Sequence, residues 1–198
     1  MKRVVVFVKN PVEGQVKTRL AAQIGSEAAL KIYNQLLKHT AQVCQHLPYA
    51  VYYSYKVLKN DDFKTPSKYV QQGANLGDRM RNALQEGFSM GYTHQVLIGS
   101  DLPRLSYALL MQAFEQLAKH EIVLGPAEDG GYYLIGMQAP FREVFNKIDW
   151  STNRVLSQTL QQCKPYKYDL LDTLTDIDTE EDLKKFPELH KHTYERTN

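Results

Sequence analysis

The sequence has few of the features that mark secreted, membrane-bound or nucleic-acid-binding proteins. Two cysteines in 198 residues indicate neither a disulfide framework nor a zinc cluster. The formal net charge of +2 provides no strong field for a nucleic acid polymer or an anionic membrane. No apolar run is long enough to span a bilayer, and the run at residues 4–8 is too short for a signal peptide. We therefore expect a cytoplasmic protein without a membrane span.

Several known site fingerprints are also missing. The sequence contains no Walker A loop and no Gly-x-Gly-x-x-Gly turn, so neither of these phosphate-binding motifs is available. Ser100 lacks a surrounding Gly-x-Ser-x-Gly elbow, which argues against a hydrolase nucleophile. The six histidines share no spacing that indicates a metal site. Any anion site must therefore come from local clustering of charge.

The chain alternates strand-like and helix-like segments. Runs rich in β-branched and aromatic residues predict strands at residues 4–8, 50–55, 69–71, 95–99, 122–124, 132–136 and 166–171. Apolar residues at steps of three and four predict helices at about residues 26–47, 76–90, 106–117, 153–162 and after 179. This alternation favours right-handed βαβ units. We expect a single Rossmann-like α/β domain over residues 1–198, with a mostly parallel mixed sheet and a polar tail from about residue 187.

The loop after the first strand is a candidate phosphate site. It supplies the cations Lys9, Lys17 and Arg19, and Gly14 lies within it. A diphosphate needs positive charge and freed backbone donors at this end of a parallel sheet. The alternative interpretation is an exposed loop with solvated lysines.

Three acidic positions are candidates for a metal or an acceptor site. Asp101 follows the strand at residues 95–99, where a carboxylate can enter the crevice and hold magnesium. Asp129 lies beside Gly130 at the start of another strand, and Asp178 precedes the last helix. Each has a structural alternative: a turn aspartate, a hairpin turn and a helix cap, respectively. A carboxylate that points into a solvent-filled cleft should contribute little to unliganded stability.

Taken together, the motifs resemble a known family. They lie at residues 7–11, 14–20, 72–80, 99–103, 125–136, 149–152 and 176–179. The chain is similar to the DUF2064 family, also called the radical-SAM/selenodomain-associated glycosyltransferases of the GT-A superfamily. The resemblance implies a nucleotide-diphospho-sugar transferase fold. It also implies kinship with cofactor guanylyltransferases and molybdenum-cofactor nucleotidyltransferases.

Residues and resemblance together predict a transferase that uses a nucleotide-activated donor, most simply a glycosyltransferase acting on a nucleotide sugar and an unknown small acceptor. The predicted diphosphate and nucleotide contacts are Lys9, Gly14, Lys17, Arg19, Gln72, Gly73 and Arg79. The predicted acceptor side comprises Asp129, Gly130 and Trp150. Asp101 and Asp178 are the predicted ligands of Mg²⁺ or Mn²⁺, with Asp129 as the alternative second ligand. Asp101, Lys17 and Arg19 are the predicted catalytic residues.

Two other functions stay open at this stage. One is a nucleotidylyltransferase that uses a nucleoside triphosphate and releases pyrophosphate. The other is a nucleotide-binding module without turnover. The sequence names neither the base, the sugar nor the acceptor, and it leaves the oligomeric state open.

Overall fold

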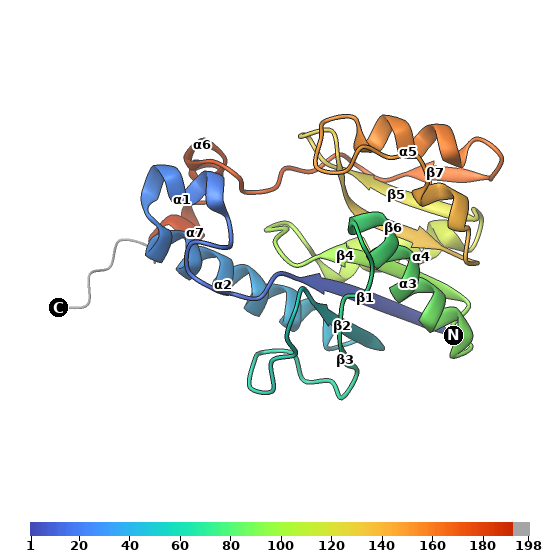
Figure 1. The fold of residues 1–198 in the computed structure, drawn as a ribbon, viewed down its shortest axis with the longest axis horizontal. Helices are drawn as coiled ribbons and strands as arrows, with labels where there is room; N and C mark the ends of the chain where they lie inside the picture. Colours follow the sequence, from blue (N-terminus) through green and yellow to red (C-terminus); the bar gives the residue numbers. More distant parts are fainter. Residues whose placement is uncertain (192–198) are drawn as a thin grey trace.

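The computed structural model describes residues 1–191 as a seven-stranded sheet with helices on both faces (Figure 1). The strands are β1 (Lys2–Val8), β2 (Tyr49–Tyr53), β3 (Lys68–Val70), β4 (His94–Gly99), β5 (Ile122–Pro126), β6 (Tyr132–Met137) and β7 (Tyr168–Leu170). The helices are α1 (Thr18–Ile24), α2 (Ser26–Cys44), α3 (Leu76–Ser89), α4 (Tyr107–Leu117), the 3-10 helix η1 (Arg142–Phe145), α5 (Val155–Cys163), α6 (Glu180–Lys184) and α7 (Pro187–Lys191).

The strand order is β3-β2-β1-β4-β6-β5-β7. All pairings are parallel except those of β6, which runs antiparallel to both β4 and β5. The short turn between β5 and β6 is compatible only with an antiparallel pair, because a parallel pair needs a crossover of a dozen or more residues. The predicted α/β fold with a mostly parallel mixed sheet is confirmed.

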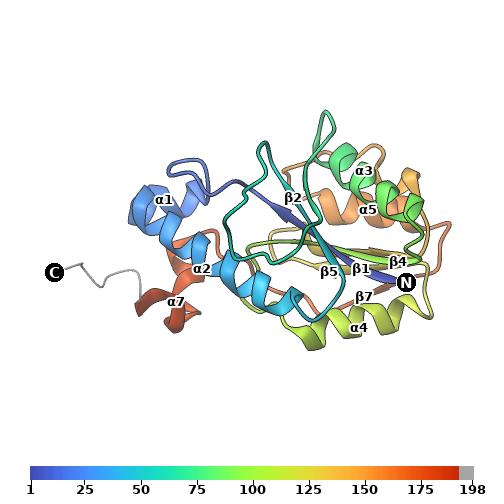
Figure 2. The ribbon, with the colours of Figure 1, turned by 90° about the horizontal axis from the view of Figure 1, so that it is seen from below.

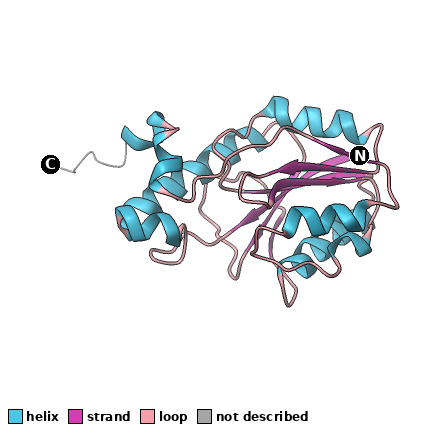
Figure 3. Cartoon of the chain, turned by 90° about the horizontal axis from the view of Figure 1, so that it is seen from above, coloured by secondary structure: helices cyan, strands magenta, loops and turns pink. Residues whose placement is uncertain are grey.

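Helices cover the sheet in two layers. Figure 2 shows α3 and α5 on one side of the sheet and α4 on the other, and the same layers are visible in Figure 3. Buried side chains of α2 and α4, such as Leu37 and Phe114, form one core with the sheet. Met80 and Leu84 of α3, with Phe145 of η1, form the other. The central strands are buried on both faces, as their unbroken apolar runs predict.

A third, smaller core lies beyond the end of the sheet, where α1, α2, α6 and α7 meet (Figure 1). Its buried members are Leu20, Ala29, Ile32, Leu36, Ile177, Leu183 and Phe186. This core fastens the last part of the described chain to the helix that follows the first loop. It thereby brings two segments far apart in the sequence to the same edge of the sheet.

Two elements differ from the sequence-based expectation. The short helix α1 was not predicted, because its N-cap Lys17 offers no capping side chain and the helix has only 7 residues. Part of the expected polar tail forms α7 (Pro187–Lys191), and the rest of that tail, residues 192–198, lies outside the described residues. Between residues 1 and 191, no helix is long and apolar enough to cross a membrane.

Candidate functional site

The candidate site lies where β1 and β4 end side by side. These neighbouring parallel strands pair up to Phe7 and Gly99. Because β2 lies on one side of β1 and β4 on the other, the chain leaves these two strands in opposite directions, which opens a crevice between their loops. A cleft of about 640 Å³ occupies this position.

The loop after β1 is held in place by its polar side chains. The buried Asn10 amide donates to the Lys56 carbonyl at 2.6 Å, and its side-chain oxygen accepts from the Ser54 hydroxyl at 2.9 Å. At the other end of the loop, Glu13 accepts from the Ser26 hydroxyl at the start of α2 at 2.7 Å. The loop is therefore tied to the segment after β2 and to α2, and its cations project from a fixed backbone.

Lys17 is the most unusual residue of this loop. Its backbone is left-handed, with φ 47° and ψ 45°, a conformation that costs a non-glycine residue free energy and is often found at functional sites. Only 4% of its side chain is exposed. Its Nζ lies 2.7 Å from Asp101 Oδ2 and 3.6 Å from Asp178 Oδ1, and Arg19 meets the other Asp178 oxygen at 3.4 Å. Two cations and two carboxylates thus converge at one end of the cleft.

Lys17 and Asp101 each stabilise the charged form of the other. Burial disfavours the Lys17 ammonium, but Asp101 and Asp178 outweigh burial and raise the Lys17 pKa above its ordinary value. Burial likewise disfavours the Asp101 carboxylate, but the Lys17 charge and hydrogen bond lower its pKa below the ordinary value. Both groups are therefore charged at neutral pH.

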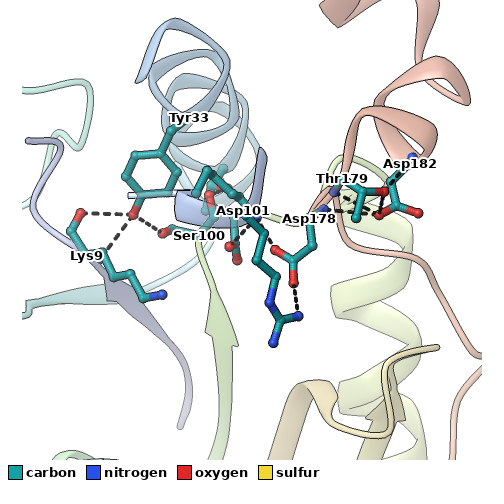
Figure 4. Close-up of polar contacts among 10 residues, drawn as sticks. Lys9, Tyr33, Ser100, Asp101, Asp178, Thr179 and Asp182 are labelled. Carbon is teal, nitrogen blue, oxygen red and sulfur yellow. Dashed lines mark hydrogen bonds and ion pairs between the residues drawn. The ribbon is translucent and has the colours of Figure 1, made fainter. Parts of the chain in front are cut away.

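A buried tyrosine connects the loops that follow β1 and β4. The Tyr33 hydroxyl, on α2, accepts from the Lys9 amide at 3.0 Å and donates to the Lys9 carbonyl at 2.9 Å. It also lies 3.1 Å from the Ser100 hydroxyl, next to Asp101 (Figure 4). Thr40, about two turns further along the same face of α2, donates to the Ser100 carbonyl at 3.2 Å. Helix α2 therefore sets the spacing between the cationic loop and the acidic loop.

Asp178 is positioned by the start of α6. Thr179 and Asp182 form a capping box, in which the Asp182 carboxylate accepts from the Thr179 amide at 3.0 Å (Figure 4). The same carboxylate accepts from the Asp178 amide at 3.3 Å. Ile177, which lies between Asp176 and Asp178 in the sequence, is fully buried in the third core. The cap and the core together direct Asp178 toward Lys17.

The opposite wall of the cleft depends on two glycines. A Cβ at Gly77, in the first turn of α3, would lie 2.4 Å from the Trp150 ring, so the absent side chain lets the indole pack there. Gly130 has a φ of 87°, and a Cβ there would lie 2.2 Å from the Asn153 carbonyl oxygen. The turn after β5 and the segment before α5 therefore pack closely, and both face the cationic loop across the cleft.

The cleft brings together most of the predicted site residues. Lys9, Lys17, Arg19, Asp129, Trp150 and Asp178 line it. Asp101 joins them through its ion pair with Lys17, and Gly130 through its neighbours Asp129 and Gly131. Gly14 supplies a turn with φ 73° in the first loop.

The segment predicted to border the base lies differently. The Gly73 carbonyl accepts from Arg79 Nε at 3.2 Å, and the Gln72 carbonyl accepts from Asn82 at 2.9 Å. None of Gln72, Gly73 and Arg79 lines the cleft formed by the described residues, although the adjacent Leu76 does. Their nucleotide-binding role stays a prediction.

Sequence reasoning missed Asp176 as a member of the site. Burial, followed by the negative charge of Asp101, raises the pKa of Asp176 to about 7. The available signal was the alternation Asp-Ile-Asp, which in an extended segment places both carboxylates on the side opposite the buried Ile177. Other wall residues that were not predicted are Phe7, Gln15, Thr18, Leu76, Met80, Leu97, Gly99, Gly131, Tyr132, Tyr133, Ser151, Thr152, Asn153 and Val155.

Comparison with solved structures places the fold in the nucleotide-diphospho-sugar transferase class. A protein of Desulfovibrio desulfuricans G20, provisionally described as a nucleotide-diphospho-sugar transferase, is 31% identical, with a TM-score of 0.83 over 99% of this chain and 89% of that one. Rv0371c of Mycobacterium tuberculosis H37Rv is 15% identical, with a TM-score of 0.56 over 94% and 97%. The 4-diphosphocytidyl-2C-methyl-D-erythritol synthase of Anaerococcus prevotii DSM 20548 is 10% identical, with a TM-score of 0.53 over 96% and 98%.

Residues 36–152 match the family DUF2064, described as "Uncharacterized protein conserved in bacteria". This match covers more than half of the chain, and the chain belongs to that family, as its motifs predict. No curated protein matches the chain significantly.

Proposed function

We propose that the protein transfers a sugar from a nucleotide sugar to a small acceptor in this cleft. The observation that carries the proposal is the convergence of Lys17 and Arg19 with Asp101 and Asp178 at one end of the cleft. Such a cluster suits a diphosphate and its counter-ion, because charges that develop on the leaving phosphates meet fixed charges of the protein. The description of the D. desulfuricans relative supports the same class of donor.

In this proposal one side of the cleft binds the donor diphosphate, and the other side binds the acceptor. Lys9 and Arg19 neutralise the diphosphate, and the turn at Gly14 shapes the loop that carries them. The acceptor approaches from the opposite wall, beside Trp150. Its oxygen forms a bond to the anomeric carbon while the bond from that carbon to the phosphate breaks, and Asp129 takes the released proton.

The carboxylates fit a divalent cation. Oxygens of Asp101 and Asp178 lie 2.7 and 3.6 Å from the same Lys17 nitrogen, so both can approach one positive centre. No cluster of three or more metal-ligating side chains is found in the described part of the chain. The pair Asp101 and Asp178 is nevertheless sufficient for Mg²⁺ or Mn²⁺, because these ions accept one or two carboxylates and take their other ligands from water and phosphate. When bound, the ion would stabilise negative charge on the leaving diphosphate.

Product analysis tests the proposal. The protein is incubated with Mg²⁺ or Mn²⁺ and one donor at a time, and water can replace the unknown acceptor in a slow hydrolysis. Nucleoside diphosphate released from a nucleotide sugar, and absent with an Asp101→Asn protein prepared in parallel, supports sugar transfer. Nucleotide sugars that stay intact while a triphosphate yields pyrophosphate would instead establish the nucleotidylyltransferase. Binding without any turnover would indicate the nucleotide-binding module.

A nucleotide with metal is expected to stabilise the fold. At a hundredfold excess over the dissociation constant, the free energy of unfolding should rise by about 2.7 kcal/mol. For a chain of this length, that gain raises the melting temperature by roughly 5 to 11 °C. Thermal-shift measurements with nucleotide sugars, nucleoside diphosphates and bare nucleosides check this expectation. A melting temperature that no nucleotide changes would contradict a nucleotide site.

Tyr33→Phe is expected to weaken ligand binding without opening the core. The ring stays packed, but the hydroxyl that joins Lys9 to Ser100 is lost. A lost hydrogen bond of this kind costs about 0.5 to 1.5 kcal/mol in stability. The affinity for nucleotide with metal, measured by calorimetry, should fall several-fold because the two loops are no longer held at one spacing.

Tyr52→Phe is the matched control for Tyr33→Phe. It removes another buried tyrosine hydroxyl, one that donates to Glu86 on α3 at 2.7 Å. Its stability loss should be similar, with unchanged affinity for the ligand. Equal affinities in both variants and the parent protein would show that the Tyr33 link is only structural.

A further inference from the structure

The Lys17 ammonium occupies the point to which the two carboxylates converge. It lies 2.7 Å from Asp101 and 3.6 Å from Asp178, and the third acid, Asp176, also acts on its charge. The acids belong to the loop after β4 and the segment before α6. Among the described ion pairs, Lys17 alone contacts acids of both segments, whereas Arg19 contacts Asp178 only. A cation held by oxygen atoms of two carboxylates is therefore already part of the protein.

The environment of Lys17 differs from that of an ordinary phosphate-binding lysine. Such a side chain reaches into the cleft and stays solvated until the anion arrives. Lys9 is placed to do so, because it is exposed, lines the cleft and forms no ion pair with an acid among residues 1–191. Lys17 instead has only 4% of its side chain exposed. Lys17 has a left-handed backbone and is the N-cap of α1, which begins at Thr18. The loop conformation thus presents this ammonium to the acids.

We propose that Lys17 is a built-in counter-ion of the acid pair, which a divalent cation must displace before the site can hold substrate. This inference rests on the metal site of the proposed function. A divalent ion and an ammonium compete for the same carboxylate oxygens, because the two positive charges repel each other strongly at the separation that shared oxygens would impose. A free divalent ion therefore binds weakly, and the displaced ammonium becomes available to a phosphate group.

Such an exchange explains why a site needs both a buried lysine and acids. With the diphosphate present, Lys17 gains a new anionic partner at the moment it loses the carboxylates, so metal and nucleotide favour each other's binding. Without the diphosphate, the displaced ammonium has no equivalent partner. The protein then keeps its acids neutralised and resists binding a metal ion alone.

Mn²⁺ binding to the whole protein, without nucleotide, tests the exchange. Lys17→Met keeps the length and apolar part of the side chain and removes its charge, and the left-handed backbone is no less accessible to methionine than to lysine. We expect this variant to bind Mn²⁺ at least about tenfold more tightly than the parent protein, as measured by electron paramagnetic resonance of the free ion. Ordinary loss of a phosphate-binding lysine would leave the affinity for the ion alone unchanged.

Lys9→Met is the matched control, because it removes an exposed cation of the same loop that acts on Asp101 through its charge but forms no described ion pair with either acid. Its Mn²⁺ affinity should change by no more than about threefold, as for exposed charges. Equal Mn²⁺ affinity in the Lys17→Met variant and the parent would overturn the proposal. An absence of Mn²⁺ binding in both the Lys17→Met variant and the parent would also overturn it. The proposed function is tested separately, by nucleotide binding and turnover.

Amine labelling of the parent protein covers the case in which Lys17→Met does not fold. Acetylation by an amine-reactive ester, followed by mass spectrometry, compares Lys17 with Lys9 in one sample. Lys17 should be modified slowly in metal-free protein, at least about tenfold faster with saturating Mn²⁺, and slowly again when a nucleoside diphosphate is added. A Lys17 labelling rate that saturating Mn²⁺ leaves unchanged would show that the ammonium is not displaced.

Discussion

Asp101→Asn is expected to lower the rate of nucleotide-sugar cleavage by about a hundredfold to a thousandfold, the usual loss when one electrostatic contact of a transition state is removed. Asparagine keeps the shape of the side chain but removes the charge that faces Lys17 at 2.7 Å. A neutral amide also binds Mg²⁺ less well than a carboxylate. The measurement is release of nucleoside diphosphate at saturating donor and metal.

Asp62→Asn is the control for loss of one carboxylate charge. Asp62 is exposed, on the loop between β2 and β3, and it lines no part of the cleft. Its variant should cleave the donor at the parent rate. If Asp101→Asn also retained the parent rate, the charge of Asp101 would have no part in the reaction, and the metal site would have to lie elsewhere.

The stability of the Asp101→Asn protein should also fall. The sequence alone suggested a carboxylate in solvent that contributes little to the fold. The structure instead places it against Lys17, whose side chain is 4% exposed, whereas that of Asp101 is 35% exposed. Because the variant leaves a buried ammonium with only the more distant Asp178, we expect a loss of about 1 to 3 kcal/mol. Thermal unfolding without ligand measures this loss of stability separately from the loss of activity.

Much of the fold could be predicted because its determinants are local. The unbroken apolar run at residues 4–8 predicts a strand covered on both faces, and those residues are buried in the centre of the sheet. Ser106 predicts the start of a helix, and its hydroxyl caps α4 by accepting from the Leu109 amide at 3.1 Å. Helix α1 could not be predicted, because this short helix has no side-chain cap and is stabilised by the tertiary packing of Leu20.

The positions of the candidate site residues could be predicted more readily than their contacts. The rule that ligands bind at the carboxyl ends of parallel strands selects the loops of Lys17 and Asp101 from the sequence. It cannot show that Lys17 is buried, because burial depends on a left-handed backbone and on acids contributed by distant segments. The approach of Asp178 likewise depends on the third core, whose members are scattered over the two ends of the chain.

Leu183→Ala is expected to separate that third core from the rest of the molecule. Leu183 is fully buried in α6. Replacing a buried leucine with alanine costs about 2.7 to 5 kcal/mol, which lowers the melting temperature by roughly 5 to 20 °C at this chain length. Because α6 also fixes Asp178 through the capping box, the affinity for metal and nucleotide should fall by about tenfold or more, at a temperature where the protein is still folded.

Leu117→Ala is the control that separates a local effect on Asp178 from a general loss of stability. Leu117 is also fully buried, but it lies at the end of α4, in the core shared by α4 and the sheet, and it lines no part of the cleft. Its variant should lose similar stability and keep the parent affinity for metal and nucleotide, measured by calorimetry under the same conditions. Equal weakening in both variants would mean that lower global stability explains the effect. Parent-like affinity in Leu183→Ala would show that Asp178 does not depend on the third core for its position.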